Sequence, residues 1–154
     1  MQVYLVQHGL AMSKEEDASR PLSATGREEV ERVAQAAAAA GVRPESILHS
    51  GKTRALQTAE IFAAHVKPTH GIQAAEGLDP GDEPHRMRER LEQADEPVML
   101  VGHLPHLGRL TSLLLAGAPE REFVAFRNAG VLCLERQGNR FALRFILTPE
   151  LVVP

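Results

Sequence analysis

Short apolar runs that end abruptly in polar residues constrain the fold of this chain most. The runs Val3–Val6, Ser46–His49 and Pro97–Val101 are too short for helices, and they lack the alternation of a half-exposed strand. Continuous runs of this length are typical of strands buried on both faces of a parallel sheet. The sequence therefore predicts a sheet that is covered on both sides.

Helical signals follow each of these runs. The first predicted helix begins at about Ser23 or Thr25, where Thr25 and Glu28 have capping-box spacing, and it ends at Gly41. Further helices are expected in three places: residues 52–66, residues 84–94 and the apolar stripe that starts at Leu107. The alternation of strands and helices predicts an α/β fold, a three-layer α/β/α sandwich with a mostly parallel sheet.

The last part of the chain instead predicts a hairpin. Val131–Glu135 and Phe141–Leu147 alternate between apolar and polar residues, and Gln137-Gly138-Asn139 between them reads as a turn. Neither an internal repeat nor a linker-like change of composition interrupts the sequence. We therefore expect one domain over residues 1–154.

Composition excludes several classes of function. A formal net charge of -3 gives no basic footprint for nucleic acid, and no run of about 18 apolar residues predicts a membrane span. The single Cys133 excludes an intrachain disulfide and is expected to pack in a strand. Residues 1–5 lack the features of a secretion signal. We expect a cytoplasmic enzyme with no nucleic-acid or membrane partner.

Polar residues follow three of the predicted strands. His8, Ser50 and His103 each lie just past the carboxyl end of a strand. In an open α/β sheet, binding sites lie beyond the carboxyl ends of the strands. These three residues are therefore expected to meet in one site.

Two histidines in this set could carry phosphoryl-transfer chemistry. A neutral imidazole at His8 can attack a phosphoryl group through one nitrogen while the other nitrogen donates to a fixed acceptor. His103 can neutralise charge on the equatorial oxygens, and Gly9 offers a free N–H to a bound group. Taken singly, each histidine could equally be a loop residue without a catalytic role.

Two arginines could bind phosphate at the same edge. Arg54 lies near the start of the helix after the second strand, where its planar fork can meet phosphate oxygens. Arg20 lies in the loop after His8 and could reach the same pocket. The alternative for each arginine is a solvated surface charge.

Other chemistry-bearing motifs are absent or weak. The sequence contains no GxxxxGK[ST], GxGxxG, HExxH, CxxC or GxSxG pattern. His103 and His106 have HxxH spacing, which leaves a metal-dependent hydrolase as a minor alternative, although His106 is expected to be structural or solvent-facing. We predict neither a metal nor a cofactor.

The spaced motifs, taken together, closely resemble one family over nearly the whole chain. In order, they are His8-Gly9, Arg20-Pro21-Leu22-Ser23 with Gly26 downstream, Ser50-x-x-x-Arg54-Ala55-x-Gln57-Thr58-Ala59, and Gly102-His103. This order resembles the histidine phosphatase superfamily, which is also called phosphoglycerate-mutase-like. The short chain resembles the SixA-type phosphohistidine phosphatases within it.

The resemblance implies an activity and a role for each matching residue. It implies a phosphoglycerate-mutase-like fold and a metal-independent, two-step phosphatase reaction through a phosphohistidine on His8. Arg54 matches the phosphate-clamping arginine, His103 the second histidine, and Arg20 the arginine of the Arg-Pro-Leu motif. The chain has no room for the lid insertion of larger relatives, so phosphohistidine on a protein is expected as substrate ahead of a small phosphorylated molecule.

One residue departs from the family pattern. Gln7 stands where the resemblance expects the arginine of Arg-His-Gly, so position 7 keeps an N–H donor for the substrate but lacks the charged fork. A catalytically weakened phosphate- or phosphoprotein-binding module is therefore the alternative function. The general acid is also open, because Glu76, Asp79 and Asp82 are all candidates in the loop after the third strand.

Overall fold

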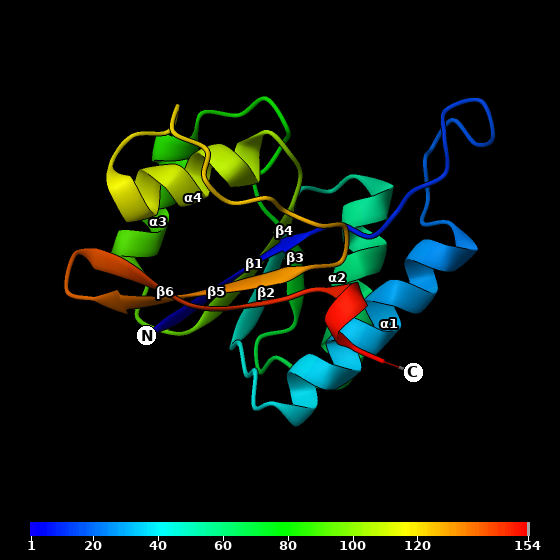
Figure 1. Cartoon of the computed structure of the whole chain (residues 1–154), viewed down its shortest axis with the longest axis horizontal. Helices are drawn as coiled ribbons and strands as arrows, with labels where there is room; N and C mark the ends of the chain where they lie inside the picture. Colours follow the sequence, from blue (N-terminus) through cyan, green and yellow to red (C-terminus); the bar gives the residue numbers. More distant parts are fainter. Residues whose placement is uncertain (154) are drawn as a thin grey trace.

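A six-stranded sheet forms the centre of the molecule, and the computed structural model describes residues 1–153 (Figure 1). Four strands run parallel in the order β3-β2-β4-β1, and the hairpin β5-β6 continues the sheet antiparallel beyond β1. The strands are β1 (Gln2–Gln7), β2 (Ser46–His49), β3 (Ile72–Ala74), β4 (Val98–Gly102), β5 (Val131–Gln137) and β6 (Arg140–Leu147). The predicted mostly parallel sheet and its terminal hairpin are confirmed.

Two α-helices cover each face of the sheet within residues 1–153 (Figure 1). Helices α1 and α2 pack on one face, and α3 and α4 pack on the other. The helices are α1 (Ala24–Ala39), α2 (Thr53–Val66), α3 (Pro84–Gln93), α4 (His106–Ala116) and the short 3-10 helix η1 (Pro149–Leu151). No helix in the described part of the chain is long and apolar enough to cross a membrane.

The alternation of side chains along β1 builds two cores, one on each face of the sheet. Tyr4 and Val6 are buried in the cluster under α1 and α2, whereas Val3 and Leu5 are buried in the cluster under α3 and α4. Successive side chains of a strand point to opposite faces, so a strand that is apolar at every position must be covered twice. The predicted three-layer sandwich is therefore confirmed.

The register of the central strands sets their carboxyl ends level. Gln7 of β1 pairs with Gly102 of β4, and His49 of β2 pairs with Val101 of β4. The residues that follow these three strands therefore leave the sheet at the same edge. This edge is where an α/β fold places its ligands.

Helix α1 begins differently from the predicted capping box. Ser23 is the N-cap, and its hydroxyl accepts the N–H of Gly26 at 3.0 Å, whereas Thr25 lies inside the helix. Gly26 occupies this position because a Cβ there would lie 2.0 Å from the carbonyl oxygen of Leu10. The Thr25–Glu28 capping box is therefore wrong, while Gly41 follows the helix with φ +89° as expected.

Candidate active site

Three strand ends bring two histidines and a serine together. The ring centroids of His8 and His103 lie 5.0 Å apart, with the rings inclined at 49°. The hydroxyl oxygen of Ser50 lies 2.6 Å from His103 Nε2, so the segment after β2 joins the same cluster. The predicted convergence of His8, Ser50 and His103 is therefore confirmed.

His8 is held in one tautomer by its neighbour. Its Nδ1 lies 2.7 Å from the carbonyl oxygen of Gly9, which can only accept a hydrogen bond. The pKa of His8 is lowered to about 4, mainly by burial and also by the charges of Arg54 and Arg20, while the contact with Gly9 opposes the shift. At neutral pH the ring is therefore uncharged, with its proton on Nδ1 and a free electron pair on Nε2.

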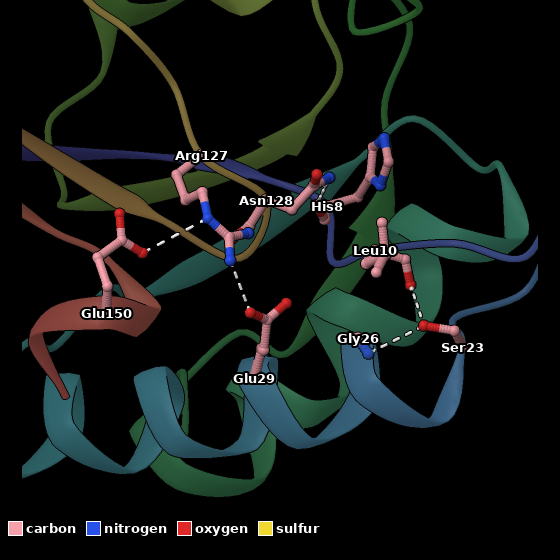
Figure 2. Close-up of polar contacts among 8 residues, drawn as sticks. All are labelled: His8, Leu10, Ser23, Gly26, Glu29, Arg127, Asn128 and Glu150. Atoms are coloured by element: carbon pink, nitrogen blue, oxygen red, sulfur yellow. Dashed lines mark hydrogen bonds and ion pairs between the residues drawn. The ribbon is translucent and has the colours of Figure 1, made fainter. Parts of the chain in front are cut away.

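The backbone of His8 is fixed by a polar network from the segment before β5 (Figure 2). The side-chain amide of Asn128 donates to the His8 carbonyl oxygen at 2.9 Å. Next to it, Arg127 pairs with Glu29 of α1 at 2.7 Å and with Glu150 at 3.4 Å (Figure 2). Sequence reasoning missed these residues, because an arginine and an asparagine in a short polar segment carry no motif of their own.

Gly9 has a different role from the predicted one. Its N–H donates to the Thr58 hydroxyl at 3.0 Å, and this hydroxyl donates to the Arg54 carbonyl oxygen at 2.8 Å. A Cβ at Gly9 would lie 2.5 Å from a methyl carbon of Val30. The expectation of a free N–H for substrate is therefore wrong, because Gly9 lets the His8 loop lie against α1 and α2.

Arg54 and Arg20 place two positive charges beside His8. Arg54 lies in the first turn of α2, and its half-buried side chain has an Nε without a hydrogen-bond partner in residues 1–153. Burial and, next, the charge of Arg20 lower the pKa of Arg54. Arg20, at φ +48°, is anchored by its Nε, which donates to the Met12 carbonyl oxygen at 3.1 Å. The structure thus brings both predicted arginines to the His8 pocket.

His103 contributes hydrogen-bonding capacity rather than charge. It is buried, and its Nδ1 has no hydrogen-bond partner in the part of the chain that the structure describes. The pKa of His103 is lowered to about 3, mainly by burial, and the charges of Arg54 and Lys52 act in the same direction. A bound phosphate dianion would oppose these effects and favour protonation.

Gln7 ends β1 directly before the nucleophile candidate. Its backbone carbonyl oxygen accepts the N–H of Ala129 at 3.0 Å, which fixes the main chain there. The side-chain Oε1 is buried and finds no partner within residues 1–153. This oxygen can only accept a hydrogen bond and so does not itself bind phosphate oxygens, and the contact of Gln7 with substrate stays a prediction.

The three candidate acids gather around a neighbouring cavity. Glu76, Asp79 and Asp82 line a volume of about 460 Å³ together with Ser50. Glu76 pairs with Arg86 at 2.6 Å, and Asp82 accepts the N–H of Asp79 at 2.9 Å. In the described chain, none of the three hydrogen-bonds to His8 or His103, and only the Asp79 carboxylate has no partner. The general acid therefore stays open, with Asp79 the least committed candidate.

His106 is structural in position, as expected. It is fully buried at the start of α4, and burial lowers its pKa. Neither ring nitrogen has a hydrogen-bond partner among residues 1–153. In the same described residues, no three histidine, cysteine, aspartate or glutamate side chains gather in a way that could hold a metal ion.

The site has the features of a phosphoryl-transfer centre. It combines a neutral histidine, a second histidine and two arginines at the carboxyl edge of a parallel sheet. Comparison with known proteins agrees with this class. The chain belongs to the histidine phosphatase superfamily, since the model of its branch 1 matches residues 3–80. The matched residues include the motifs around His8, Arg20 and Arg54 on which the predicted resemblance depends.

Individual relatives cover the chain more completely. An uncharacterized protein of Picosynechococcus is 33% identical, with all of both chains covered. The structure of the protein histidine phosphatase SixA in complex with tungstate has a TM-score of 0.85 at 24% identity, covering 97% of each chain. A protein of Agrobacterium tumefaciens assigned as phosphohistidine phosphatase SixA has a TM-score of 0.76 at 28% identity, covering 96% and 97%. The phosphoglycerate-mutase-like fold is thereby confirmed.

Proposed function

We propose that this chain is a metal-independent phosphatase that works through a covalent phosphohistidine on His8, with phosphohistidine on a protein as its substrate. The observation that carries the proposal is the contact between His8 Nδ1 and the Gly9 carbonyl oxygen at 2.7 Å. It places the proton on Nδ1 and leaves the electron pair of Nε2 for the attack on phosphorus.

The reaction follows in two displacements. In the first, His8 Nε2 forms a bond to phosphorus, the bond to the leaving nitrogen breaks, and that nitrogen takes a proton from the general acid. The Nδ1–H donated to Gly9 spreads the positive charge of the new phosphoimidazolium. In the second, water attacks phosphorus, the bond to Nε2 breaks, and its electron pair returns to the ring, while the water loses a proton to the conjugate base of the same acid. Arg54, Arg20 and His103 bind the equatorial oxygens throughout.

Two features support a protein substrate. The segments around His8 carry no inserted helix as a lid in the described chain, since the loops after β1 (residues 8–23) and β3 (residues 75–83) contain no helix and the four α-helices cover the faces of the sheet. The chain is also similar to a protein assigned as phosphohistidine phosphatase SixA. A phosphorylated side chain on a folded partner needs such an open approach to the nucleophile.

The test is phosphate release from a phosphohistidine peptide, with and without EDTA. We expect turnover that chelation does not change, and an alkaline quench should trap a phosphoryl group on the peptide that contains His8. His8→Ala should abolish both the adduct and turnover, whereas His70→Ala, at an exposed histidine, should change neither. Undiminished turnover by His8→Ala would overturn the mechanism, and activity restored by zinc or manganese after chelation would favour a metal-dependent hydrolase.

Gln7 motivates a second candidate function. Without the guanidinium of the family pattern, the site could hold phosphate or a phosphoprotein without turning it over. This binding module predicts retention of a phosphohistidine peptide by the wild-type protein with no phosphate released and no adduct on His8.

A further inference from the structure

A second cavity, which we call the basic pocket, lies against Arg54. It has a volume of about 500 Å³, and its lining includes four cations, Lys14, Arg20, Lys52 and Arg54. The cations come from two separate segments, the loop after His8 and the start of α2. The pocket also holds two of the three lysines in the sequence, although the chain as a whole is acidic with a formal net charge of -3.

No carboxylate lines the pocket beside these four cations, although Glu15, Glu16 and Asp17 lie in the same loop as Lys14. Within residues 1–153, none of them forms an ion pair with a carboxylate, whereas four other arginines of the chain do. Burial and, next, the charge of Arg20 lower the pKa of Arg54, so the two guanidinium groups lie close enough for the charge of Arg20 to act on Arg54. Gathered like charges without counter-ions raise the local potential and attract anions.

The start of α2 adds to this potential. Lys52 is the N-cap of the helix and gives it no side-chain hydrogen bond in the described structure. Thr53, the first residue of the helix, lines the pocket. A helix N-terminus carries partial positive charge, so it acts in the same sense as the four side chains.

One phosphoryl group does not account for this charge. A phosphate dianion at His8 is balanced by the two guanidinium groups of Arg54 and Arg20, and the two lysines then remain. We propose that the basic pocket binds a second anionic group, a carboxylate or a phosphate, which the substrate carries beyond the phosphoryl group that is transferred. This inference rests on the proposed function, because the reacting phosphate is what delivers the second anion to the pocket.

The positions of the two lysines determine which kinetic constant the second anion should change. Lys14 and Lys52 are exposed and flexible, so they attract and hold the substrate without touching the reacting atoms. Their contribution should therefore change KM rather than kcat. It should also fall at high salt, because exposed charges are screened over about 3 Å at 1 M ionic strength.

The test compares matched substrates. Two phosphohistidine peptides would differ only in glutamate or glutamine beside the phosphohistidine, and a hexose bisphosphate would be compared with its monophosphate. We expect kcat/KM to be about tenfold higher for the substrate with the second anion, mostly through KM, and this preference to shrink at 1 M salt. A preference within the peptide pair identifies an acidic protein segment as its source, and one within the sugar pair a small molecule.

The double variant Lys14→Gln/Lys52→Gln should remove the preference, because it lowers kcat/KM more for the glutamate peptide than for the glutamine peptide. Lys67→Gln is the control, since this exposed lysine lies at the opposite end of α2. Equal kcat/KM within both substrate pairs would overturn the proposal, as would a loss in the double variant that is the same for both peptides.

A binding measurement separates this proposal from the proposed function. A stable phosphotriazole analogue of each peptide can be titrated by fluorescence anisotropy, so no turnover is needed. Tighter binding of the glutamate analogue, lost in the double variant, supports the basic pocket even if wild type releases no phosphate. Identical affinities for the two analogues would overturn it even if the enzyme is active.

Discussion

The two cavities that border the site have opposite charge. The basic pocket is lined by four cations, whereas the neighbouring cavity, which we call the acidic pocket, is lined by Glu76, Asp79 and Asp82. The two adjoin at consecutive residues, because Ser50 and Asp79 line the acidic pocket while Gly51 and Pro80 line the basic one. A sharp reversal of charge thus lies beside the histidine pair.

In the proposed reaction the two sides would have different tasks. Arg54 and Arg20, on the basic side, would neutralise negative charge on the phosphoryl group. The leaving nitrogen would need a proton, and the candidates that line the acidic pocket are Glu76, Asp79 and Asp82, of which Asp79 has a carboxylate without a partner in residues 1–153. The predictions that follow test each side in turn.

Arg54→Ala should have the largest effect on the basic side. We expect kcat/KM to fall by about 100- to 1,000-fold, because a charged donor to the phosphoryl oxygens is lost where Gln7 offers no charge in its place. Arg140→Ala, at an exposed arginine of β6, should leave kcat/KM unchanged. Steady-state kinetics with a phosphohistidine peptide measure both, and a loss below fivefold for Arg54→Ala would remove it from the phosphate site.

Asp79→Asn tests the acidic side through the leaving group. If Asp79 protonates the leaving nitrogen, kcat/KM should fall by about 100-fold on a phosphohistidine peptide. The fall on para-nitrophenyl phosphate should be small, because nitrophenolate leaves without a proton. Asp82→Asn is the matched control, since Asp82 already accepts the Asp79 N–H. Equal losses on both substrates would mean that Asp79 is not the acid.

Gln7→Arg would restore the family residue and sharpen the contrast in charge. A charge-assisted hydrogen bond contributes about 1.5–3 kcal/mol, so kcat/KM should rise about tenfold or more. Gln7→Lys, which adds the charge without the planar fork, should recover less. A binding module would instead gain affinity for phosphate without turnover, and unchanged kinetics and affinity would mean that position 7 does not face the phosphate.

The sheet and helices could be predicted because they depend on patterns that repeat over many residues. The apolar run Val3–Val6 required two covered faces, and the strand ends then had to bring His8 and His103 together. Details that depend on single contacts between distant segments could not be predicted in this way. The spacing allows the first helix to begin at Ser23 or Thr25, and the structure shows Ser23 as the cap, with Gly26 packed on Leu10, a contact that no local spacing reveals.

In the candidate site, too, some positions follow from repeated patterns and others depend on single contacts between distant segments. The side chains that carry chemistry follow strands or begin a helix, so their positions follow from the topology. The groups that position them come from elsewhere, such as Thr58 on the far side of Gly9 and Asn128 from the segment before β5. Their contacts depend on the packed tertiary structure. The sequence alone therefore does not reveal that the Gly9 N–H donates to Thr58 and is not free for substrate.

Stability should depend on pH in a way that the buried histidines determine. The pKa values of His8, His49, His103 and His106 are all lowered in the folded protein, with burial as the main cause. Below pH 6.5 these histidines are protonated in the unfolded chain but remain neutral in the folded protein. The free energy of unfolding should therefore fall as pH decreases from about 6.5 to 4. Chemical denaturation across this range measures the fall.

His106→Leu should have the smallest effect on activity and a clear effect on this pH dependence. His106 is fully buried, which lowers its pKa against the opposing charges of Asp82 and Asp79, and neither ring nitrogen is satisfied by residues 1–153. Leucine would remove a buried polar group that costs about 1–3 kcal/mol and one of the four groups that titrate on unfolding. We therefore expect a more stable protein, a shallower loss of stability towards pH 4 and kcat/KM within about twofold.

His106→Gln, which keeps an unsatisfied polar side chain, should flatten the pH dependence without the gain in stability at pH 7. A large loss of kcat/KM in both variants, with stability maintained, would instead show that the acidic side depends on His106 to position its carboxylates.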